Sequence, residues 1–295
     1  MADGFKRELL TDAQVRPFVE NVLCIKNRRR VDKAVLLIKR SEVWLNNFGE
    51  YSTLIPKEHW MPPYDTIKTR ENLRMRIVHE LFDNERLFDD DKTRLGRGGA
   101  KPIGKEPIKA QTAYIIIGLP ASGKSSVANT IADYTASYLI DSDIAKRKLK
   151  EYKNDGGASL VHDESSGLAD MLLTECTKAK YNMVIPRIGS NFEAIKKYCE
   201  TFTKKNYAVF LVLVELDRQY ATIRAYNRYL ETERYIPLSK IYDSYANDST
   251  LTYYRMIQQA PDLLSGYLHL NNEVPINNPP KIIECNNMYD IGNLF

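Results

Sequence analysis

The sequence contains few cysteines and no long apolar run, and each shortage excludes a class of protein. Its four cysteines among 295 residues show neither a Cys-x-x-Cys pair nor the spacing of metal ligands, so we expect no disulfide framework and no cysteine-bound metal. This usage is typical of a protein that folds in a reducing cytosol. No stretch approaches the ~18 apolar residues of a membrane-spanning helix. The charged opening MADGFKRELL lacks the apolar segment of a secretory signal peptide.

Excess charge of one sign is also scarce. The formal net charge is +4, which suits a protein that handles phosphorylated ligands but falls short of the basic bias of nucleic-acid-binding proteins. We therefore expect neither a membrane nor a nucleic acid as partner. With 43% hydrophobic and 27% charged residues, the composition is that of a globular protein, and the length allows one α/β domain with a smaller appendage.

The chain falls into three parts. Residues 1–93 carry helical periodicity, with apolar stripes in 31–48 and 73–87 that prolines separate. Residues 94–112 are rich in charge, glycine and proline, and we interpret them as a linker. A phosphate-gripping loop at RGGAK, within this linker, is the alternative. Residues 113–295 form the predicted catalytic domain.

Strands and helices alternate in that third part. The runs AYIIIG at 113–118 and AVFLVLVE at 208–215 predict strands that are buried on both faces of a parallel sheet. The pattern predicts an α/β P-loop NTPase or kinase fold, an open and mainly parallel sheet with helices on both faces, preceded by a mainly helical N-terminal region. The other expected elements are strands at 138–140, 182–185 and 281–285, and helices at 127–135, 159–179, 191–205, 217–232 and 237–258.

The segment between the first strand and its helix decides the functional class. It reads GLPASGKS and matches G-x-x-x-x-G-K-[ST], in which glycines let backbone N–H groups point at phosphate oxygens. Lys124 is expected to reach the β- and γ-phosphates, and the Ser125 hydroxyl to bind Mg²⁺. The sequence therefore predicts that ATP or GTP is bound by Gly118, Leu119, Pro120, Ala121, Ser122, Gly123, Lys124, Ser125 and Ser126.

Two aspartates, Asp141 and Asp143, follow the second strand. Ligands of doubly wound sheets bind beyond the carboxyl ends of the strands, so both carboxylates should project toward the phosphate loop. Phosphoryl transfer to a hydroxyl uses a carboxylate that accepts the proton. We assign this role to Asp143 and a substrate contact to Asp141. A helix N-cap is the alternative role for Asp143, and the two roles are compatible.

Arginines come from the helix after the strongest strand. Arg224 and Arg228 lie four residues apart on one helical face, and Arg234 follows the helix. A planar guanidinium is well suited to the charge that spreads over the γ-phosphate oxygens. We expect Arg224 and Arg234 to be catalytic and Arg228 to bind the nucleotide. An ordinary solvated helix face is the alternative.

Together these motifs resemble the zeta-toxin family of P-loop kinases. The resemblance covers residues 113–258 and rests on Gly-x-Pro-x-Ser-Gly-Lys-Ser, the strand-end Asp-x-Asp, and the stretch from Arg224 to Arg234-Tyr-Ile-Pro237. It implies a kinase that phosphorylates a sugar hydroxyl of UDP-N-acetylglucosamine, and similar effectors of plant pathogens phosphorylate a nicotinamide dinucleotide. It also implies that Lys124 and Ser125 bind nucleotide and Mg²⁺, that Asp143 is the general base, and that the two arginines bind phosphate.

The resemblance also implies a place for the acceptor. The segment that opens the long helix stands where the family has substrate-contacting residues, which makes His162, Glu164 and Ser166 candidates. After the third strand the family carries an acidic residue and a glycine-rich turn, whereas this chain has Pro186-Arg187-Ile188-Gly189. Arg187 is therefore our candidate for gripping an anionic substrate. The N-terminal 110 residues lie outside the resemblance.

Three functions are compatible with the motifs. We favour a small-molecule kinase with ATP or GTP as co-substrate, Mg²⁺ as cofactor and a small hydroxyl-bearing acceptor. We expect it in the cytoplasm, or delivered into the cytosol of a target cell, with an antitoxin-like inhibitory protein as a further partner. The second function is a polynucleotide or nucleoside kinase, against which the missing basic and aromatic stripe argues. The third is a nucleotide-gated switch whose partner surface is the helices of residues 1–93.

Overall fold

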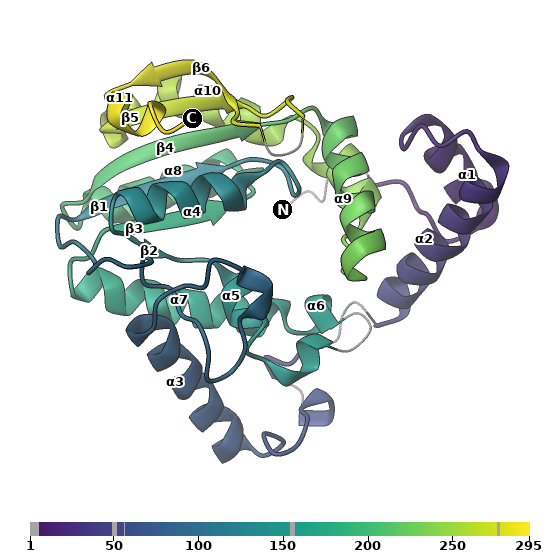
Figure 1. Cartoon of the computed structure of the whole chain (residues 1–295), viewed down its shortest axis with the longest axis horizontal. Coiled ribbons are helices and arrows are strands. Elements are labelled where there is room, and N and C mark those ends of the chain that lie inside the picture. The colour runs from purple at the N-terminus through teal and green to yellow at the C-terminus, as the bar shows by residue number, and fades with distance from the viewer. Residues whose placement is uncertain (1–5, 49–51, 56, 154–156, 276–277) are drawn as a thin grey trace.

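A six-stranded sheet in the order β2-β3-β1-β4-β5-β6 forms the centre of the molecule (Figure 1). The structure is a computed structural model that describes residues 6–48, 52–55, 57–153, 157–275 and 278–295. The first five strands in this order run parallel, and β6 pairs with β5 in the antiparallel direction. The strands are β1 Thr112–Ile117, β2 Tyr138–Leu139, β3 Met183–Arg187, β4 Ala208–Glu215, β5 Gly266–Asn271 and β6 Lys281–Asn286.

The central strands are apolar on both faces. Ile115, Ile116 and Ile117 of β1 are fully buried. In the register of the sheet, Ile115 stands between Ile185 of β3 and Leu211 of β4. Continuous apolar runs of this kind belong to parallel strands that helices cover on both sides. The predicted open, mainly parallel sheet is confirmed.

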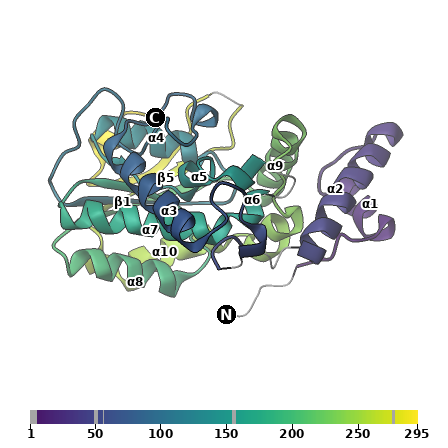
Figure 2. The ribbon, with the colours of Figure 1, turned by 90° about the horizontal axis from the view of Figure 1, so that it is seen from below.

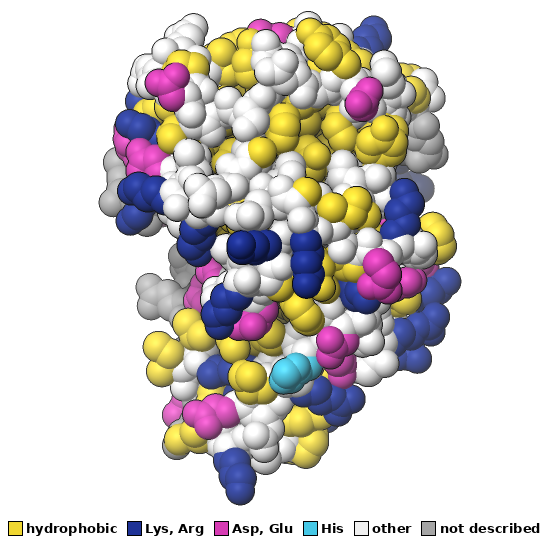
Figure 3. All heavy atoms as spheres, turned by 90° about the vertical axis from the view of Figure 1, so that its left-hand side faces the viewer, with side chains coloured by type: hydrophobic (Ala, Val, Ile, Leu, Met, Phe, Trp, Pro, Cys, Tyr) yellow, Lys and Arg dark blue, Asp and Glu magenta, His cyan; other side chains and the backbone are white. Residues whose placement is uncertain are grey.

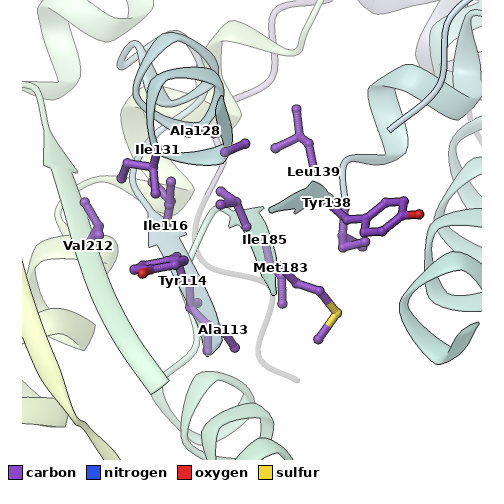
Figure 4. Packing of buried hydrophobic residues seen from close by; sticks show 14 of the residues in the cluster. Ala113, Tyr114, Ile116, Ala128, Ile131, Tyr138, Leu139, Met183, Ile185 and Val212 are labelled. Atoms are coloured by element: carbon purple, nitrogen blue, oxygen red, sulfur yellow. The ribbon is translucent and has the colours of Figure 1, made fainter. Parts of the chain in front are cut away.

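Helices cover both faces of this sheet. Figure 2 shows α4 on one face and α8 and α10 on the other. Ala128 and Ile131 of α4 point toward Ile116 and Ile185 of the sheet (Figure 4). Burial of an isoleucine side chain contributes about 1.5–3 kcal/mol, so this packing fixes the start of α4 beside the end of β1. The helices are α4 Lys124–Tyr134, α5 Ser142–Lys146, α6 Gly157–Leu160, α7 His162–Lys178, α8 Phe192–Thr203, α9 Arg218–Thr232, α10 Asp248–Gln259 and α11 Tyr289–Gly292.

An N-terminal hairpin of two helices stands beside α9, away from the sheet (Figure 1). It consists of α1 (Asp12–Asn21) and α2 (Arg28–Phe48), whose apolar residues share one buried cluster with those of α9. Two polar contacts also join the N-terminal segment to residues that follow α9. Arg7 forms an ion pair with Asp243 at 2.7 Å, and the Tyr235 hydroxyl donates to the Glu42 carboxylate at 2.6 Å.

The third N-terminal helix belongs to the main core. α3 (Ile67–Asp83) places Leu73 and Ile77 in the large cluster that surrounds the sheet. The segment that we expected to be a linker packs beside it. Ala100 is fully buried, and its carbonyl oxygen accepts a hydrogen bond from the Leu139 N–H of β2 at 2.9 Å. Residues 94–112 are therefore fixed to the core along part of their length.

Two C-terminal features differ from the sequence expectation. The helix predicted at 237–258 is interrupted, because a π-helical turn at Lys240–Tyr245 ends at Ala246, which adopts a φ of 38°. The strand β5 was not predicted. Its sequence GYLHLN mixes glycine and polar residues into a short stretch, so it lacks the apolar run by which the other buried strands are recognised.

The face of the molecule turned away from the hairpin carries basic and acidic side chains that are interspersed (Figure 3). This distribution agrees with the small net charge of +4. Within the described ranges, every helix is too short or too polar to cross a bilayer.

Candidate active site

The loop that joins β1 to α4 needs glycine at two positions. Gly123 precedes α4 with a φ of 95°, and a Cβ there would overlap the side-chain amide of Asn272. A Cβ on Gly118 would overlap the carbonyl oxygen of Val214 in β4. The first turn of α4 then presents Ser125, which is exposed. Backbone N–H groups at such a helix start form a ready site for a phosphate.

The side chain of Lys124 folds back over this loop. Its Nζ donates hydrogen bonds to the carbonyl oxygens of Gly118 at 2.7 Å and of Leu119 at 2.5 Å. Desolvation lowers the pKa of Lys124 to about 7; the nearby Arg228 charge adds to this, and the charges of Asp141 and Asp143 oppose it. A phosphate in the loop would offer the ammonium a charged partner in place of two carbonyl groups, and would favour its protonated form.

We expect the protein to take up a proton when it binds ATP above neutral pH. With a pKa of about 7, Lys124 of the free protein loses its charge as the pH rises, whereas bound phosphate restores that charge. The affinity for ATP should therefore fall by up to about tenfold per pH unit between about pH 7 and about pH 9. Calorimetry in two buffers of different ionisation enthalpy should show that nearly one proton is taken up per ATP at the upper end of this pH range.

The Lys124→Arg variant is the matched control for this effect. Its guanidinium stays charged throughout that range, so whatever affinity remains should not depend on pH. An affinity of the wild-type protein that is independent of pH would contradict a Lys124 that is neutral in the free state.

Ser122 and Asn272 frame the loop from the other side. The Ser122 hydroxyl is buried and has no hydrogen-bond partner in the described part of the chain. Its backbone carbonyl accepts a hydrogen bond from the Asn272 amide at 2.7 Å. A buried hydroxyl without a partner costs about 1–3 kcal/mol, and an oxygen of a bound phosphate would provide one.

Asp141 and Asp143 lie at the start of the short helix α5. Asp141 is the N-cap, and its Oδ1 accepts the Asp143 N–H at 2.9 Å. The N-cap role that we considered for Asp143 thus belongs to Asp141 instead. Burial, together with the neighbouring Asp143 charge, raises the pKa of Asp141 to about 6.

The carboxylate of Asp143 lies between two cations. Its Oδ1 accepts from Lys146 Nζ at 2.9 Å, and its Oδ2 accepts from Arg234 at 2.6 Å. Burial alone would raise the pKa of Asp143, but the Arg234 and Lys146 charges outweigh it and hold that pKa well below its usual range. Asp143 is therefore a carboxylate at every physiological pH, ready to accept a hydrogen bond from a ligand hydroxyl.

The three predicted arginines have different surroundings. Arg234 contacts Asp143 as described, and its guanidinium lies over the Tyr152 ring at 5.8 Å. Arg228 is partly buried, and its Nε is unpartnered among the residues that the structure describes. Burial and the Arg234 charge lower the pKa of Arg228. A buried Nε with an unused N–H fits an anionic ligand.

Arg224 points to the chain that connects β5 and β6. It donates hydrogen bonds to the carbonyl oxygens of Asn272 at 3.1 Å and Val274 at 2.8 Å. Since Asn272 also bonds to Ser122, Arg224 supports the phosphate loop through this connection. The structure brings Arg234 to Asp143 but places Arg224 on backbone carbonyls.

Among the candidates at the start of α7, His162 lies close to the charged cluster of Asp143, Lys146 and Arg234. Desolvation, with a contribution from the Lys146 charge, lowers the pKa of His162, and Lys146 is the residue that also binds Asp143. The Ser166 hydroxyl bonds within the helix, to the His162 carbonyl oxygen at 2.9 Å.

Glu164 has a structural role in place of the substrate contact that we predicted. Its side chain is 1% exposed and pairs with Arg70 and with Arg74. Burial would raise the pKa of Glu164, but the hydrogen bonds from the arginines lower it. A carboxylate that is buried and bound by two guanidinium groups of α3 is not available to a ligand.

Arg187 stands at the end of β3, level with Ile117 at the end of β1. Its guanidinium lies 5.3 Å from the Tyr198 ring and donates to the Tyr198 hydroxyl at 3.2 Å. A weaker contact to Asp170 measures 3.4 Å. Arg187 thus lies at the same edge of the sheet as the phosphate loop, and its partners are the half-buried Tyr198 and the exposed Asp170, which a stronger anion could replace.

Two residues at the site, Lys146 and Asn272, were not predicted from the sequence. Lys146 follows Asp143 by three residues, a spacing that places both side chains on one face of a helix and could have indicated the pair. Asn272 gave no such signal, because its position depends on β5, which was itself not predicted.

Comparisons with known proteins give the family of this chain and structures of similar fold. Residues 99–253 match the model of the protein family described as Zeta toxin. A protein in the structure of the PezAT chromosomal toxin–antitoxin system of Streptococcus pneumoniae has a TM-score of 0.55 and 13% identity, over 78% of this chain and 88% of that one. A protein in the AvrRxo1-ORF1:-ORF2 complex has a TM-score of 0.50 and 16% identity, over 81% and 74%. At these identities the two structures show a shared fold. The search of curated proteins found no match.

Proposed function

This chain belongs to the zeta-toxin family and is a P-loop phosphotransferase, and we propose what it phosphorylates and with which residues. The proposed reaction transfers the γ-phosphoryl group of ATP or GTP to a hydroxyl of a nucleotide-sugar such as UDP-N-acetylglucosamine, or of a dinucleotide. The observation that carries the proposal is the ionised Asp143, which Arg234 and Lys146 hold beside the lysine of the phosphate loop.

In the proposed mechanism the acceptor hydroxyl donates a hydrogen bond to Asp143 and faces the γ-phosphorus. Its oxygen forms the new bond to phosphorus while the bond from phosphorus to the leaving β-phosphate oxygen breaks, and the hydroxyl proton passes to Asp143. In a loose transition state this proton leaves late, so a carboxylate with a lowered pKa is sufficient to orient the hydroxyl.

Positive groups stabilise the charge that develops on the transferred group. Lys124 would leave the loop carbonyls for the β- and γ-phosphates. Arg228 has the unpartnered Nε for a phosphate oxygen, and Arg234 can meet the γ-phosphoryl group from its place on Asp143. Groups that are already in position where charge develops supply much of enzymatic rate enhancement. Arg224 acts in this proposal through the backbone that it holds.

The residues present fit Mg²⁺. Ser125 is exposed at the start of α4, and the charge of the Asp141 carboxylate acts on the adjacent Lys124. Magnesium takes few protein oxygens and several from phosphates and water. The described residues contain no group of three or more His, Cys, Asp or Glu side chains that could hold a metal ion without such other ligands. When bound, Mg²⁺ would neutralise charge on the β- and γ-phosphates.

The proposal extends to partners and place of action. His162, near Lys146, and Arg187, at the end of β3, are the proposed acceptor contacts, with Ser166 in a lesser role. We place the reaction in the cytosol, of the producing cell or of a target cell, and include an antitoxin-like protein as inhibitor. Support for this partner comes from the toxin–antitoxin system to which a structurally similar protein belongs.

A direct assay tests the acceptor. The purified chain, Mg²⁺ and γ-labelled ATP or GTP are incubated with UDP-N-acetylglucosamine, with NAD, or with an oligonucleotide, and the products are identified by mass spectrometry. We expect label on one of the first two and none from the Lys124→Ala variant. Label on the oligonucleotide alone would make the protein a polynucleotide kinase. ATP binding with no product from these acceptors or from a whole metabolite pool would favour a switch.

A further inference from the structure

A cavity of ≈ 920 Å³ lies between the N-terminal hairpin and the catalytic part of the chain. Its volume is in the upper range of small-molecule sites, about 300–1,000 Å³. One wall is α2, the second is formed by residues 152–153 and 157–159, and the third is the end of α9 with the residues that follow it. The charged and aromatic residues of the lining include Lys33, Arg40, Trp44, Tyr152, Lys153 and Arg234.

The cavity begins where the charged cluster of the active site ends. Arg234 lines it, and the same guanidinium binds the Asp143 carboxylate at 2.6 Å. Tyr152 also lines it and lies under Arg234 at 5.8 Å. A molecule whose hydroxyl reaches Asp143 can therefore extend past Arg234 into this space.

One face of α2 packs against α9, and another lines the cavity. One face packs into the cluster shared with α9, and its members Val31, Val35 and Ile38 are buried. The cavity face carries Lys33, Leu37, Arg40, Ser41, Trp44 and Leu45, which recur at the three- and four-residue spacing of one helical stripe. This second stripe mixes cations with an aromatic ring and aliphatic side chains, a set that suits a ligand with both an anion and a flat ring.

The charge in the cavity is mainly positive. Lys33, Arg40 and Lys153 have no ion-pair partner within the portion of the chain that the structure describes, and Arg234 adds a fourth cation. Among the described residues that line the space, Glu233 is the single acidic one. Three unpaired cations, together with Arg234, around a partly enclosed space favour a ligand group with more than one negative charge.

Hydrogen bonds hold the walls in place. The Ser41 hydroxyl bonds to the Tyr229 hydroxyl at 2.9 Å across the junction of α2 and α9. Nearby, the Tyr235 hydroxyl bonds to Glu42 of α2. The cavity face of α2 thus keeps its distance from α9, and a site that is formed before its ligand arrives loses less free energy on binding.

We propose that this cavity binds the part of the acceptor that lies away from the reacting hydroxyl, and that this part is a nucleoside diphosphate. Lys33, Arg40 and Lys153 contact the diphosphate, and Trp44 and Tyr152 provide the faces beside which the base lies. The hairpin of α1 and α2 is then one wall of the acceptor site. This inference rests on the proposed function, because Asp143 positions the hydroxyl of the same molecule.

Calorimetry on the full chain tests the site separately from the chemistry. The phosphate loop is first saturated with a non-hydrolysable ATP analogue and Mg²⁺, and UDP-N-acetylglucosamine and NAD are then titrated. We expect one of them to bind, and Arg40→Ala and Lys33→Ala each to weaken that binding about tenfold. The control is Arg29→Ala, an exposed arginine of α2 outside the cavity, which should stay within about twofold of wild type. Affinity for the ATP analogue should be equal in all four proteins.

The outcomes separate the two proposals. Failure of both probes to bind the wild type, or equal binding by the Arg40 and Lys33 variants, overturns the cavity assignment. If binding follows the expectation but neither probe is phosphorylated, the cavity assignment holds and the proposed acceptor reaction fails. If one probe is phosphorylated with the same KM in wild type, Arg40→Ala and Lys33→Ala, the reaction holds and the cavity assignment fails.

Discussion

Replacing Asp143 by alanine will reduce kcat by about 10³-fold or more while ATP affinity stays at or slightly above that of the wild type. The carboxylate is the group that would orient the acceptor hydroxyl and take its proton, and it is held by Arg234 and Lys146. Its removal leaves these cations without their partner close to the phosphates, so nucleotide binding does not suffer. Single-turnover assays with labelled ATP and calorimetry of ATP binding measure the two effects independently.

The Lys124→Ala variant gives the opposite combination. It too will lose phosphoryl transfer, but it will also bind ATP much more weakly, because the loop loses the cation that reaches the phosphates. The control for Asp143→Ala is Asp262→Ala, which removes an acidic side chain at an exposed position far along the chain. This variant should behave as wild type. Full product formation by the Asp143 variant would remove this residue as the base.

Replacing Arg70 by alanine will lower the free energy of unfolding by about 3–5 kcal/mol. Arg70 has no exposed surface. It donates to Glu151 at 2.7 Å and, through Nε, to Glu164 at 2.8 Å. Removing the guanidinium leaves two buried carboxylates with one remaining arginine, Arg74, which contacts Glu164 at 2.7 Å. Urea denaturation of the wild type and the variant at neutral pH measures the loss.

The decrease in the free energy of unfolding that Arg70→Ala causes should become smaller as the pH falls. In the wild type the arginines hold the pKa of Glu164 low, so its contribution to stability is present above the unfolded pKa of about 4.3 and is lost as the pH falls through the folded pKa. In the variant, burial dominates and raises the pKa, so protonation relieves the buried charge at a higher pH. The difference between the two proteins should therefore be smaller at about pH 5 than at about pH 7.

Arg76→Ala is the matched control for the Arg70 variant. Arg76 lies on the same helix and pairs with Glu80 at 2.9 Å, but its side chain is 54% exposed. An exposed ion pair contributes about 0–1 kcal/mol. Equal losses for the two variants, or a loss by Arg70→Ala that does not change with pH, would contradict the role of the buried cluster.

The phosphate loop and the central strands could be predicted from the sequence because short-range patterns determine them. A continuous apolar run requires burial on both faces, and the glycines and the lysine of GLPASGKS occupy fixed offsets from its end. Asp143 could be placed at the same edge of the sheet, because parallel strands bring their carboxyl ends together. Each of these inferences depends on residues that are near one another in the chain.

Contacts between distant segments could not be predicted. Glu164 has the position of a surface residue at a helix start, and the arginine that binds it lies 94 residues earlier in the chain. The role of Asn272 depends on a strand with too few apolar residues to be recognised. The amphipathic pattern of α2 indicated a helix with one buried face, but nothing local indicated that its other face lines a cavity.

The cluster that joins the hairpin to α9 makes the N-terminal segment part of the enzyme's folding unit. Phe18 and Ile38 are buried there together with Leu119 of the phosphate loop. A protein shortened to the region that other kinases share would leave the opposing side of this cluster in water, and apolar surface of that kind leads to self-association. Toxicity tests, inhibitor searches and ligand titrations should therefore use the uncut chain, since a trimmed protein that precipitates would say nothing about catalysis.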